Sequence, residues 1–391
     1  MKKLLLPLIL LLYMKTQAQT AQQIHDKAIV IDTHNDILSN LLITRLDFGK
    51  KQATGNFDLV RAKQGGLDAQ VFSIWCGEEY GKGAAFAIAN REIDSLYDLI
   101  ARNPGKIALV RNSKELKKAV KQKKLAALIG VEGGHMIEDR LDYIDSLAKR
   151  GMCYLTLTWN NSTSWASSAR DETHSRNSLA HIGLTDFGKQ VVHRLNDLGV
   201  MIDLSHPGEQ TFYDVLATTN KPVIASHSCV YALNPSQRNL KDDQLKALAK
   251  NGGVVFINFY SGFLDSTYAD KFTAFLGNHK AELDSLMNIY HDRDLAMIRL
   301  NAIYKTETDH MRPPLSALIK QIDYVVKLIG VDYVGLGSDF DGAESYPVGL
   351  DDVSDYPKIT AELVKIGYSE KDIDKILGGN FIRVLKANTG K

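Results

Sequence analysis

The sequence predicts an α/β protein with the fold of a (β/α)8 TIM-type barrel and a helical insertion between strands seven and eight. Eight apolar runs of strand length alternate with segments in which apolar residues recur at the helical period. The runs are nearly continuous in apolar residues, as expected of parallel strands covered on both faces. Five of them end in His, Asp or Glu or are followed directly by His, and parallel barrels gather such residues at one rim. The main alternative, a doubly wound open sheet, would not explain polar residues at nearly every strand end.

The expected strands and helices alternate along the whole chain. The strands cover residues 28–34, 68–75, 125–132, 154–160, 199–205, 222–227, 252–259 and 333–339. A helix is expected to begin after Thr185, a residue type that caps helix amino termini. Another is expected to end at Gly151, as helices often end at glycine. Ser369, like Thr185, is expected to cap the amino terminus of a helix, here the closing helix near the carboxyl terminus.

Two stretches are longer than a minimal barrel requires. Residues 159–182 form a polar loop after the fourth strand, where a barrel loop can border an active site. Residues 260–330 have a helical pattern and are interrupted by Pro313 and Pro314. Because this stretch contains no strands of its own, we expect an insertion within one domain of residues 19–391 and not a second domain.

The first 18 residues have the pattern of a signal peptide. Lys2 and Lys3 precede an apolar run over residues 4–14, and small residues lead to a cleavage site near Ala18. The apolar run is too short for a stable membrane-spanning helix. We therefore expect an exported protein, periplasmic or secreted, with no membrane span in the mature chain.

Composition narrows the classes of partner. The formal net charge is only +1, which gives no electrostatic reason to expect nucleic acid or an anionic membrane. Hydrophobic residues make up 45% of 391 positions, enough for a large core. The three cysteines, Cys76, Cys153 and Cys229, lack the CxxC spacing and are interpreted as buried free thiols.

The strand ends carry a candidate metal site. His34 and Asp36 follow the first strand at positions i and i+2, so their side chains point to the same side. Further candidates end or follow the third, fifth, sixth and eighth strands: Glu132, His206, His227 and Asp339. Such nitrogen and oxygen ligands suit zinc or a similar divalent first-row ion. A catalytic zinc uses three protein ligands plus water, so five or six candidates indicate two ions, with the carboxylate of Glu132 between them.

Other polar residues near these strand ends have different interpretations. Asp32 is expected to support the ligands or to lie in the amino-terminal layer of the barrel, and His135 to be structural or to support the ligands. His174 and His181 are expected to lie solvated in the polar loop. Arg238 follows the sixth strand, where a guanidinium can hold a substrate carboxylate in a bidentate fork. A surface ion pair is the alternative for this arginine.

Segments along almost the whole chain resemble the membrane dipeptidase (renal dipeptidase) family of zinc metallopeptidases, within the amidohydrolase-like superfamily. They cover roughly residues 24–387 and read IDTHNDI, GVEGGH, YLTLTWNNS, GLTDFGKQVVHRLNDLGVMIDLSH, PVIASHSCVYALNPSQRNL, VGLGSDFDG and GGNFIRVL. The resemblance implies two zinc ions, a dipeptide substrate and a homodimer. It assigns one ion to His34, Asp36 and Glu132, and the other to Glu132, His206 and His227.

The resemblance also implies how the reaction proceeds. Arg238 matches the arginine that receives the free C-terminal carboxylate of a dipeptide. Asp339 matches the acidic residue that handles protons beside the bridging hydroxide. We therefore expect an exported binuclear-zinc dipeptidase that hydrolyses the peptide bond of dipeptides with a free C-terminal carboxylate.

One position departs from the family pattern. Trp159 stands where the family has a histidine that contacts the substrate and the developing oxyanion. Indole donates one hydrogen bond but cannot become cationic, so stabilisation of the oxyanion should be weaker. An alternative function is therefore the same metal-hydrolase barrel acting on a different amide, a lactone or a modified peptide. A non-catalytic exported binding protein is a second alternative, against which the retention of six metal and proton-transfer candidates argues.

Overall fold

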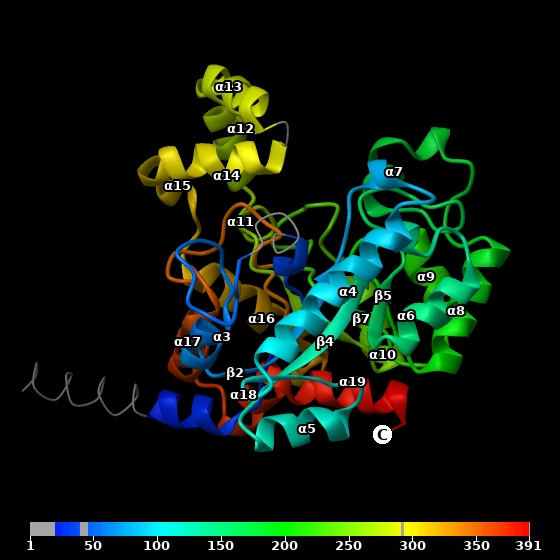
Figure 1. Cartoon of the computed structure of the whole chain (residues 1–391), viewed down its shortest axis with the longest axis horizontal. Helices are drawn as coiled ribbons and strands as arrows, with labels where there is room; N and C mark the ends of the chain where they lie inside the picture. Colours follow the sequence, from blue (N-terminus) through cyan, green and yellow to red (C-terminus); the bar gives the residue numbers. More distant parts are fainter. Residues whose placement is uncertain (1–19, 40–45, 291–292, 391) are drawn as a thin grey trace, which may run out of the picture.

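The computed structural model describes residues 20–39, 46–290 and 293–390, which form a parallel barrel surrounded by helices (Figure 1). The expected signal peptide, residues 1–18, lies outside the described residues. Within the described part of the chain, no helix has the length and apolar character needed to cross a bilayer.

The barrel wall is a single parallel sheet. Its strands follow the order β1 (Val30–Asp32), β2 (Leu67–Ile74), β4 (Leu125–Glu132), β5 (Met152–Thr156), β6 (Met201–Asp203), β7 (Ile224–Ala225), β8 (Val254–Ile257) and β9 (Val334–Leu336). The sheet returns toward its first strand, because the Thr33 amide donates to the Leu336 carbonyl at 3.2 Å and Asn35 bridges Phe340. This confirms the barrel, and each expected strand range overlaps one of these strands, although β2 begins one residue and β5 two residues before the expected range.

One further strand was not predicted. β3 (Ile107–Leu109) pairs only with β4, outside the order of the barrel wall. With three residues, it is too short for a periodic pattern to separate it from a loop.

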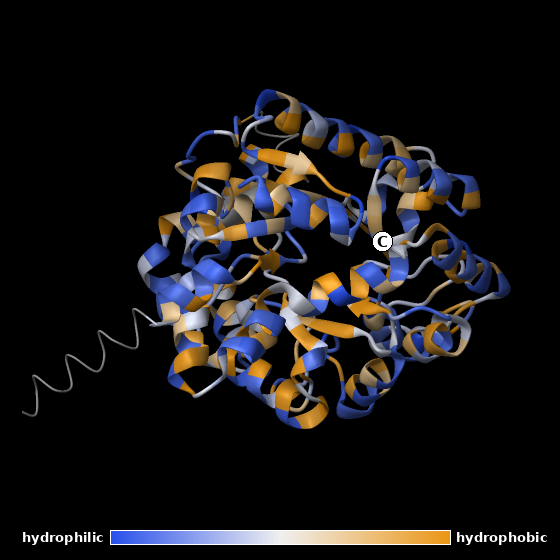
Figure 2. Cartoon of the chain, turned by 90° about the horizontal axis from the view of Figure 1, so that it is seen from below, coloured by the Kyte–Doolittle hydropathy of each residue, from blue (hydrophilic) through white to orange (hydrophobic). Residues whose placement is uncertain are grey.

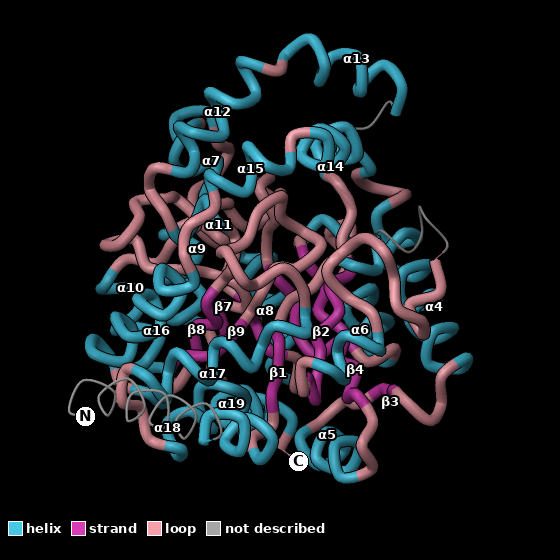
Figure 3. Tube along the Cα trace, turned by 90° about the vertical axis from the view of Figure 1, so that its left-hand side faces the viewer, coloured by secondary structure: helices cyan, strands magenta, loops and turns pink. Residues whose placement is uncertain are grey.

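Helices surround the wall on the outside. They are α3 (Leu59–Gln64), α4 (Ala85–Arg102), α6 (Leu141–Lys149), α8 (Asp186–Leu198), α9 (Glu209–Thr218), α10 (Asp242–Asn251), α16 (Leu315–Ile329) and α17 (Tyr356–Lys365). Three more helices, α5 (Ser113–Lys121), α18 (Glu370–Asp374) and α19 (Asn380–Thr389), lie at one end of the barrel (Figures 1 and 3). Figure 2 shows polar and apolar residues alternating along these helices, as expected where one face packs on the sheet.

The predicted helix ends are confirmed. The Thr185 side chain accepts a hydrogen bond from the Gly188 amide at the start of α8. The Ser369 side chain does the same for the Asp372 amide at the start of α18, and a π-helical turn, Lys375–Gly379, joins α18 to α19. α6 ends at Lys149, just before Gly151, whose φ of +106° favours glycine.

The expected helical insertion follows β8. It contains α11 (Ser261–Leu264), α12 (Tyr268–Asn278), α13 (Lys280–Tyr290), α14 (Arg293–Ile303) and α15 (Lys305–Met311). α12 to α15 share a hydrophobic cluster that includes Tyr268, Phe275 and Leu300. They lie over one end of the barrel, opposite α5, α18 and α19 (Figures 1 and 3). The last helix of the expected stretch, α16, packs on α10, α17 and β8 and therefore belongs to the ring around the barrel.

The polar loop after β5 contains the short helix α7 (Ala169–His174), which Figure 1 places at the same end of the barrel as the insertion. The three cysteines are buried and free, as the sequence analysis expected.

Candidate metal centre

The carboxyl-terminal ends of the strands bring the predicted ligands into one buried cluster. His34 and Asp36 follow β1, and Glu132 is the last residue of β4. The remaining predicted ligands, His206 and His227, follow β6 and β7. None of these five residues is more than 7% exposed. The strand-end pattern in the sequence therefore corresponds to a real convergence in space.

Glu132 lies at the centre of this cluster. Its Oε1 atom is 2.7 Å from Nε2 of His206 and 3.4 Å from Nε2 of His227. Its Oε2 atom is 3.3 Å from Nε2 of His34, which is itself 3.4 Å from Oδ2 of Asp36. One carboxylate thus faces all three imidazoles, as a bridging ligand would.

The residues fit a divalent cation. The potential ligand atoms of His34, Glu132 and His227 lie within 4.8 Å of one another, as do those of His34, Asp36 and Asp339. Nε2 of His34 and Oδ1 of Asp36 are buried and have no hydrogen-bond partner among the described residues. Since buried polar atoms are normally paired, converging lone pairs of this kind suit a metal ion. These two sets of residues differ from the two ligand sets that the family resemblance implies. The assignment of ligands to each ion therefore stays a prediction.

The pKa values of Glu132 and His206 depend on burial and on the charges of their neighbours. Burial opposes ionisation of Glu132, but the charge on His34 and hydrogen bonds from His206 and His227 hold its pKa well below the usual value. Burial, followed by the charge on nearby Arg238, lowers the pKa of His206 to about 4. In the metal-free centre Glu132 is thus ionised and His206 neutral, the forms in which these groups bind metals, and the proton that charges His34 would leave when a metal binds.

Asp339 lies beside the cluster on the loop after β9. Its Oδ2 atom accepts a hydrogen bond from Nδ2 of Asn258 at 2.9 Å, and the Asn258 amide is oriented by the Tyr260 N–H at 2.6 Å. Burial, followed by the charge on Asp36, raises the pKa of Asp339 to about 8. A carboxyl group that titrates near neutral pH is suited to take up and release a proton.

Arg238 is buried near the same centre. It is 6% exposed, its guanidinium lies 5.4 Å from the centre of the Phe263 ring, and Nη1 has no partner among the described residues. Burial lowers its pKa to about 10. The surface ion pair considered for this residue is therefore wrong, because the side chain is buried and pairs with none of the described carboxylates. A buried, unpaired guanidinium requires an anionic partner.

Trp159 lies close to the cluster. Its ring centre is 6.4 Å from that of His206 and 5.0 Å from that of Trp75. Trp75 follows β2 and was not among the predicted residues. The two indoles thus form an aromatic pair beside the candidate ligands.

Among the other polar residues, Asp32 supports the site and His174 is exposed as expected, whereas His135 contacts a backbone carbonyl and His181 is only partly exposed. Asp32 accepts hydrogen bonds from the Ser338 hydroxyl and amide at 2.6 and 2.8 Å, and so fixes β1 to the loop after β9. A ring nitrogen of His135 lies 3.0 Å from the Cys76 carbonyl and not on a ligand. His174 is exposed, and His181 is half-buried in the polar loop.

Several residues of the site were missed in the sequence. Tyr154 contacts Nδ1 of His34, and Ser226 contacts Nδ1 of His227, both at 2.8 Å. Asp203 holds Ser226, and Asn258 holds Asp339. Only Asp203, which ends the run MID, carries the strand-end signal that identified the ligands. The others are ordinary strand or loop residues whose partners are far away in sequence.

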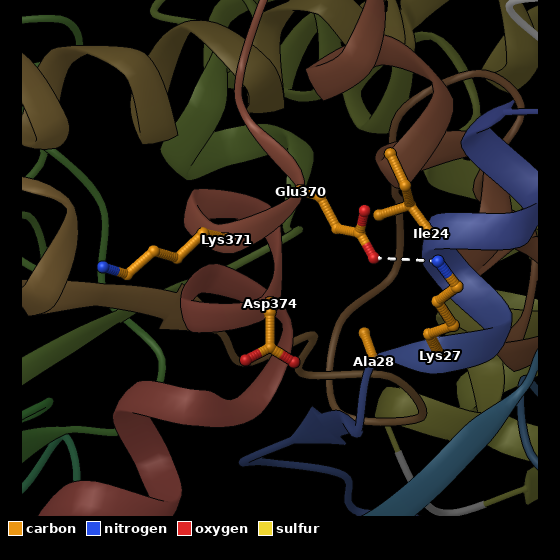
Figure 4. A pocket seen from close by; sticks show the side chains of 6 residues that line it. All are labelled: Ile24, Lys27, Ala28, Glu370, Lys371 and Asp374. Carbon is orange, nitrogen blue, oxygen red and sulfur yellow. Dashed lines mark hydrogen bonds and ion pairs between the residues drawn. The ribbon is translucent and has the colours of Figure 1, made fainter.

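A surface hollow, shown in Figure 4, lies beside α18, at the end of the barrel opposite the insertion. It is lined by Ile24, Lys27, Ala28, Glu370, Lys371 and Asp374, with Lys27 and Glu370 paired at 3.1 Å. These residues precede β1 or belong to α18, so the hollow is on the face that supports stability in barrel enzymes. It contains none of the candidate site residues.

The family model of membrane dipeptidases (peptidase family M19) matches residues 18–390. The Dipeptidase 3 proteins of Macaca fascicularis and Mus musculus are 31% and 32% identical over 366 and 362 residues. These alignments cover 91% of this chain but only 64% of each relative, so the chain spans less than two thirds of their length.

Crystal structures of two bacterial proteins share the fold. The probable dipeptidase PvdM from Pseudomonas aeruginosa is 25% identical, with a TM-score of 0.77 over 96% of this chain and 99% of that one. The metallo peptidase from Rhodobacter sphaeroides, liganded with a phosphinate mimic of the dipeptide L-Ala-D-Ala, is 24% identical, with a TM-score of 0.74 over 93% and 100%. Because the family model matches almost the whole sequence, the chain belongs to the membrane dipeptidase family, peptidase family M19.

Proposed function

We propose that this protein is a metallo-dipeptidase that hydrolyses the peptide bond of dipeptides with a free C-terminal carboxylate. The observation that carries the proposal is the buried cluster around Glu132 with the unpaired Arg238 nearby. Family membership and the Dipeptidase 3 relatives support the reaction class. The alternatives of another amide, a lactone or a modified peptide have no such support.

The proposed cofactor is a pair of zinc ions, with other divalent first-row metals as substitutes. His34, Asp36 and Glu132 would hold one ion, and Glu132, His206 and His227 the other. When bound, such ions supply Lewis acidity that lowers the pKa of water and polarises a carbonyl.

The protein's own groups then position the substrate and move protons. Arg238 binds the C-terminal carboxylate in a bidentate fork, which limits the substrate to one residue beyond the scissile bond. Asp339 takes a proton from the attacking water and passes it to the leaving amine, while Asn258 holds the other carboxylate oxygen in place. Trp159 and Trp75 border the substrate beside His206.

The experiment that tests this function measures metal content and hydrolysis on one preparation. Purified protein is assayed with L,L and L,D dipeptides, lactones and acylated amino acids, with and without added zinc. We expect about two metal ions per chain, as in two-metal hydrolases, and zinc-dependent release of free amino acids from dipeptides. Two ions with no dipeptide cleavage would contradict the substrate class, and absence of metal would contradict the mechanism.

Arg238→Met should reduce kcat/KM for dipeptides by about 10²-fold or more, since removing one partner of a buried charge pair costs about 2–5 kcal/mol. The loss should be absent for dipeptide amides, which have no carboxylate to bind and should already be poor substrates of the unchanged protein. Arg102→Met, which removes an exposed arginine of α4, is the matched control. An equal loss on acids and amides would show that Arg238 does not bind the carboxylate.

Trp159→His should increase kcat for simple dipeptides, because imidazole restores a donor that can become cationic. One donor to an oxyanion contributes about 10²–10³-fold, which bounds the gain. Trp159→Phe keeps an aromatic ring beside Trp75 but has no donor, and is expected to give no increase. Steady-state rates on one dipeptide are compared for the unchanged protein and the two variants. Equal rates for the histidine and phenylalanine variants would show that residue 159 does not contact the scissile carbonyl.

We also propose export with cleavage near Ala18, a single domain over residues 19–391, and a homodimer suggested by the family resemblance. Mass spectrometry of protein recovered from the periplasm or medium would identify the mature amino terminus. Light scattering on that protein would give the oligomeric state.

A further inference from the structure

A buried hydroxyl lies behind the candidate ligand His34. The phenol of Tyr154 donates to the Thr33 carbonyl at 3.1 Å, and its oxygen is 2.8 Å from Nδ1 of His34. All three residues are fully buried. A phenol has one proton, so a phenol that donates to Thr33 can only accept from the imidazole. This arrangement favours a proton on Nδ1 of His34.

A second hydroxyl has the same relation to His227. The Ser226 hydroxyl donates to Oδ2 of Asp203 at 2.6 Å, and its oxygen is 2.8 Å from Nδ1 of His227. The neighbouring Ser205 hydroxyl donates to the other oxygen of Asp203 at 3.1 Å. With both serine protons directed to Asp203, the Ser226 oxygen is left as an acceptor for the Nδ1 proton of His227.

Both hydrogen-bond chains leave the imidazole lone pair on the nitrogen that faces the candidate metal centre. A neutral imidazole with a proton on Nδ1 has its free lone pair on Nε2. Nε2 is the atom of His34 and His227 that faces Glu132, at 3.3 and 3.4 Å. His206 differs, because its Nδ1 has no partner among the described residues.

The strand pairing leaves space for the Tyr154 ring to reach His34. Gly130 of β4 pairs with Tyr154 of β5, and a Cβ atom at Gly130 would lie 2.1 Å from Cζ of the Tyr154 ring. The phenol therefore crosses β4 at a residue without a side chain to reach His34, which follows β1. Any larger residue at position 130 would displace the ring from His34.

We propose that Tyr154 and Ser226 are positioning residues that hold His34 and His227 in the tautomer that binds metal through Nε2. Tyr154 does so with its proton on the Thr33 carbonyl, and Ser226 with its proton on Asp203. The inference rests on the proposed function only in taking these two histidines as metal ligands. Groups that orient ligand imidazoles typically change metal affinity by about 10- to 100-fold when removed.

Zinc affinity tests the inference without any assay of hydrolysis. Tyr154→Phe and Ser226→Ala are titrated with zinc against a competing chelator, and each should bind at least one ion about 10- to 100-fold more weakly than the unchanged protein. Tyr324→Phe and Ser95→Ala remove hydroxyls on α16 and α4 and should leave affinity unchanged. Unfolding curves of the metal-free proteins show whether each variant is folded. Unchanged zinc affinity in folded Tyr154→Phe and Ser226→Ala would overturn the proposal.

A second measurement uses the unchanged protein and does not depend on the variants folding. Nitrogen-15 NMR of the zinc-loaded protein reports which ring nitrogen carries the proton. His34 and His227 should show protonated Nδ1, and a proton on Nε2 of either ring would overturn the proposal for that ring. Failure of the unchanged protein to take up zinc would instead contradict the proposed function.

Discussion

Glu132→Gln is expected to abolish dipeptide hydrolysis and metal uptake together. Both carboxylate oxygens of Glu132 face imidazole nitrogens, with His206 at 2.7 Å and His34 at 3.3 Å. Glutamine has one oxygen and no charge, and its NH2 group would point donors at lone pairs meant for the metal. Because bound metal supplies several kcal/mol of transition-state stabilisation, activity should fall by about 10³-fold or more.

Elemental analysis and a dipeptide assay on the same preparation measure this effect. Glu115→Gln removes an equal charge from an exposed position on α5 and should retain both metal and activity. Replacement of a buried group can also disturb folding, so the metal-free variant is compared with the unchanged protein by circular dichroism. A Glu132→Gln protein that keeps its full metal content and normal turnover would exclude Glu132 as a ligand.

The barrel and the convergence of the predicted ligands could be foreseen because both depend on local sequence patterns. Strands alternating with helices fix the fold, and a parallel barrel brings the carboxyl ends of its strands to one rim. His34, Glu132 and His227 therefore converge even though about 100 residues separate each from the next. The only non-local fact required was the order of the strands, and that order follows the sequence.

The contacts behind the ligands could not be predicted in the same way. Tyr154 is one apolar-looking residue in a strand, and its contact with His34 depends on the side chain crossing β4 at Gly130. Asn258, just after β8, reaches Asp339, just after the paired strand β9, over 81 positions in sequence. Such contacts depend on the register between strands and on where a small residue such as Gly130 leaves space. The pattern of hydrophobic residues gives neither of these. The aromatic partner of Trp159, Trp75, was missed for the same reason.

Asp339→Asn is expected to retain metal and to lose turnover. Asn258 already donates to one oxygen of Asp339, and asparagine keeps one oxygen toward His34 and Asp36 while the five principal ligands are unchanged. The amide cannot take a proton from water or deliver one to the leaving amine. General acid–base catalysis contributes about 10²–10⁴-fold, and kcat should fall by that factor.

The matched control for this variant is Asp68→Asn at the start of β2. Asp68 is also partly buried and accepts a single hydrogen bond, from the Val30 amide, at the opposite end of the barrel from the ligands. It should keep both metal and activity. If Asp339→Asn keeps near-normal kcat, Asp339 does not transfer the proton; if it loses the metal, Asp339 is mainly a ligand.

The same variant should change the pH dependence of stability in the metal-free protein. Burial, followed by the charge on Asp36, raises the pKa of Asp339 from 3.8 to about 8 in the folded state. Between about pH 4 and pH 8 the folded chain therefore holds a proton that the unfolded chain has lost, and its free energy of unfolding decreases as pH rises. Asp339→Asn has no titrating group at this position and lacks that decrease. The stability of the unchanged protein relative to the variant should thus fall from pH 5 to pH 8 in urea unfolding with a chelator present. A difference that does not vary with pH would mean that Asp339 is ionised in the folded metal-free protein throughout this range, which would contradict the raised pKa that suits it both to take up and to release a proton near neutral pH.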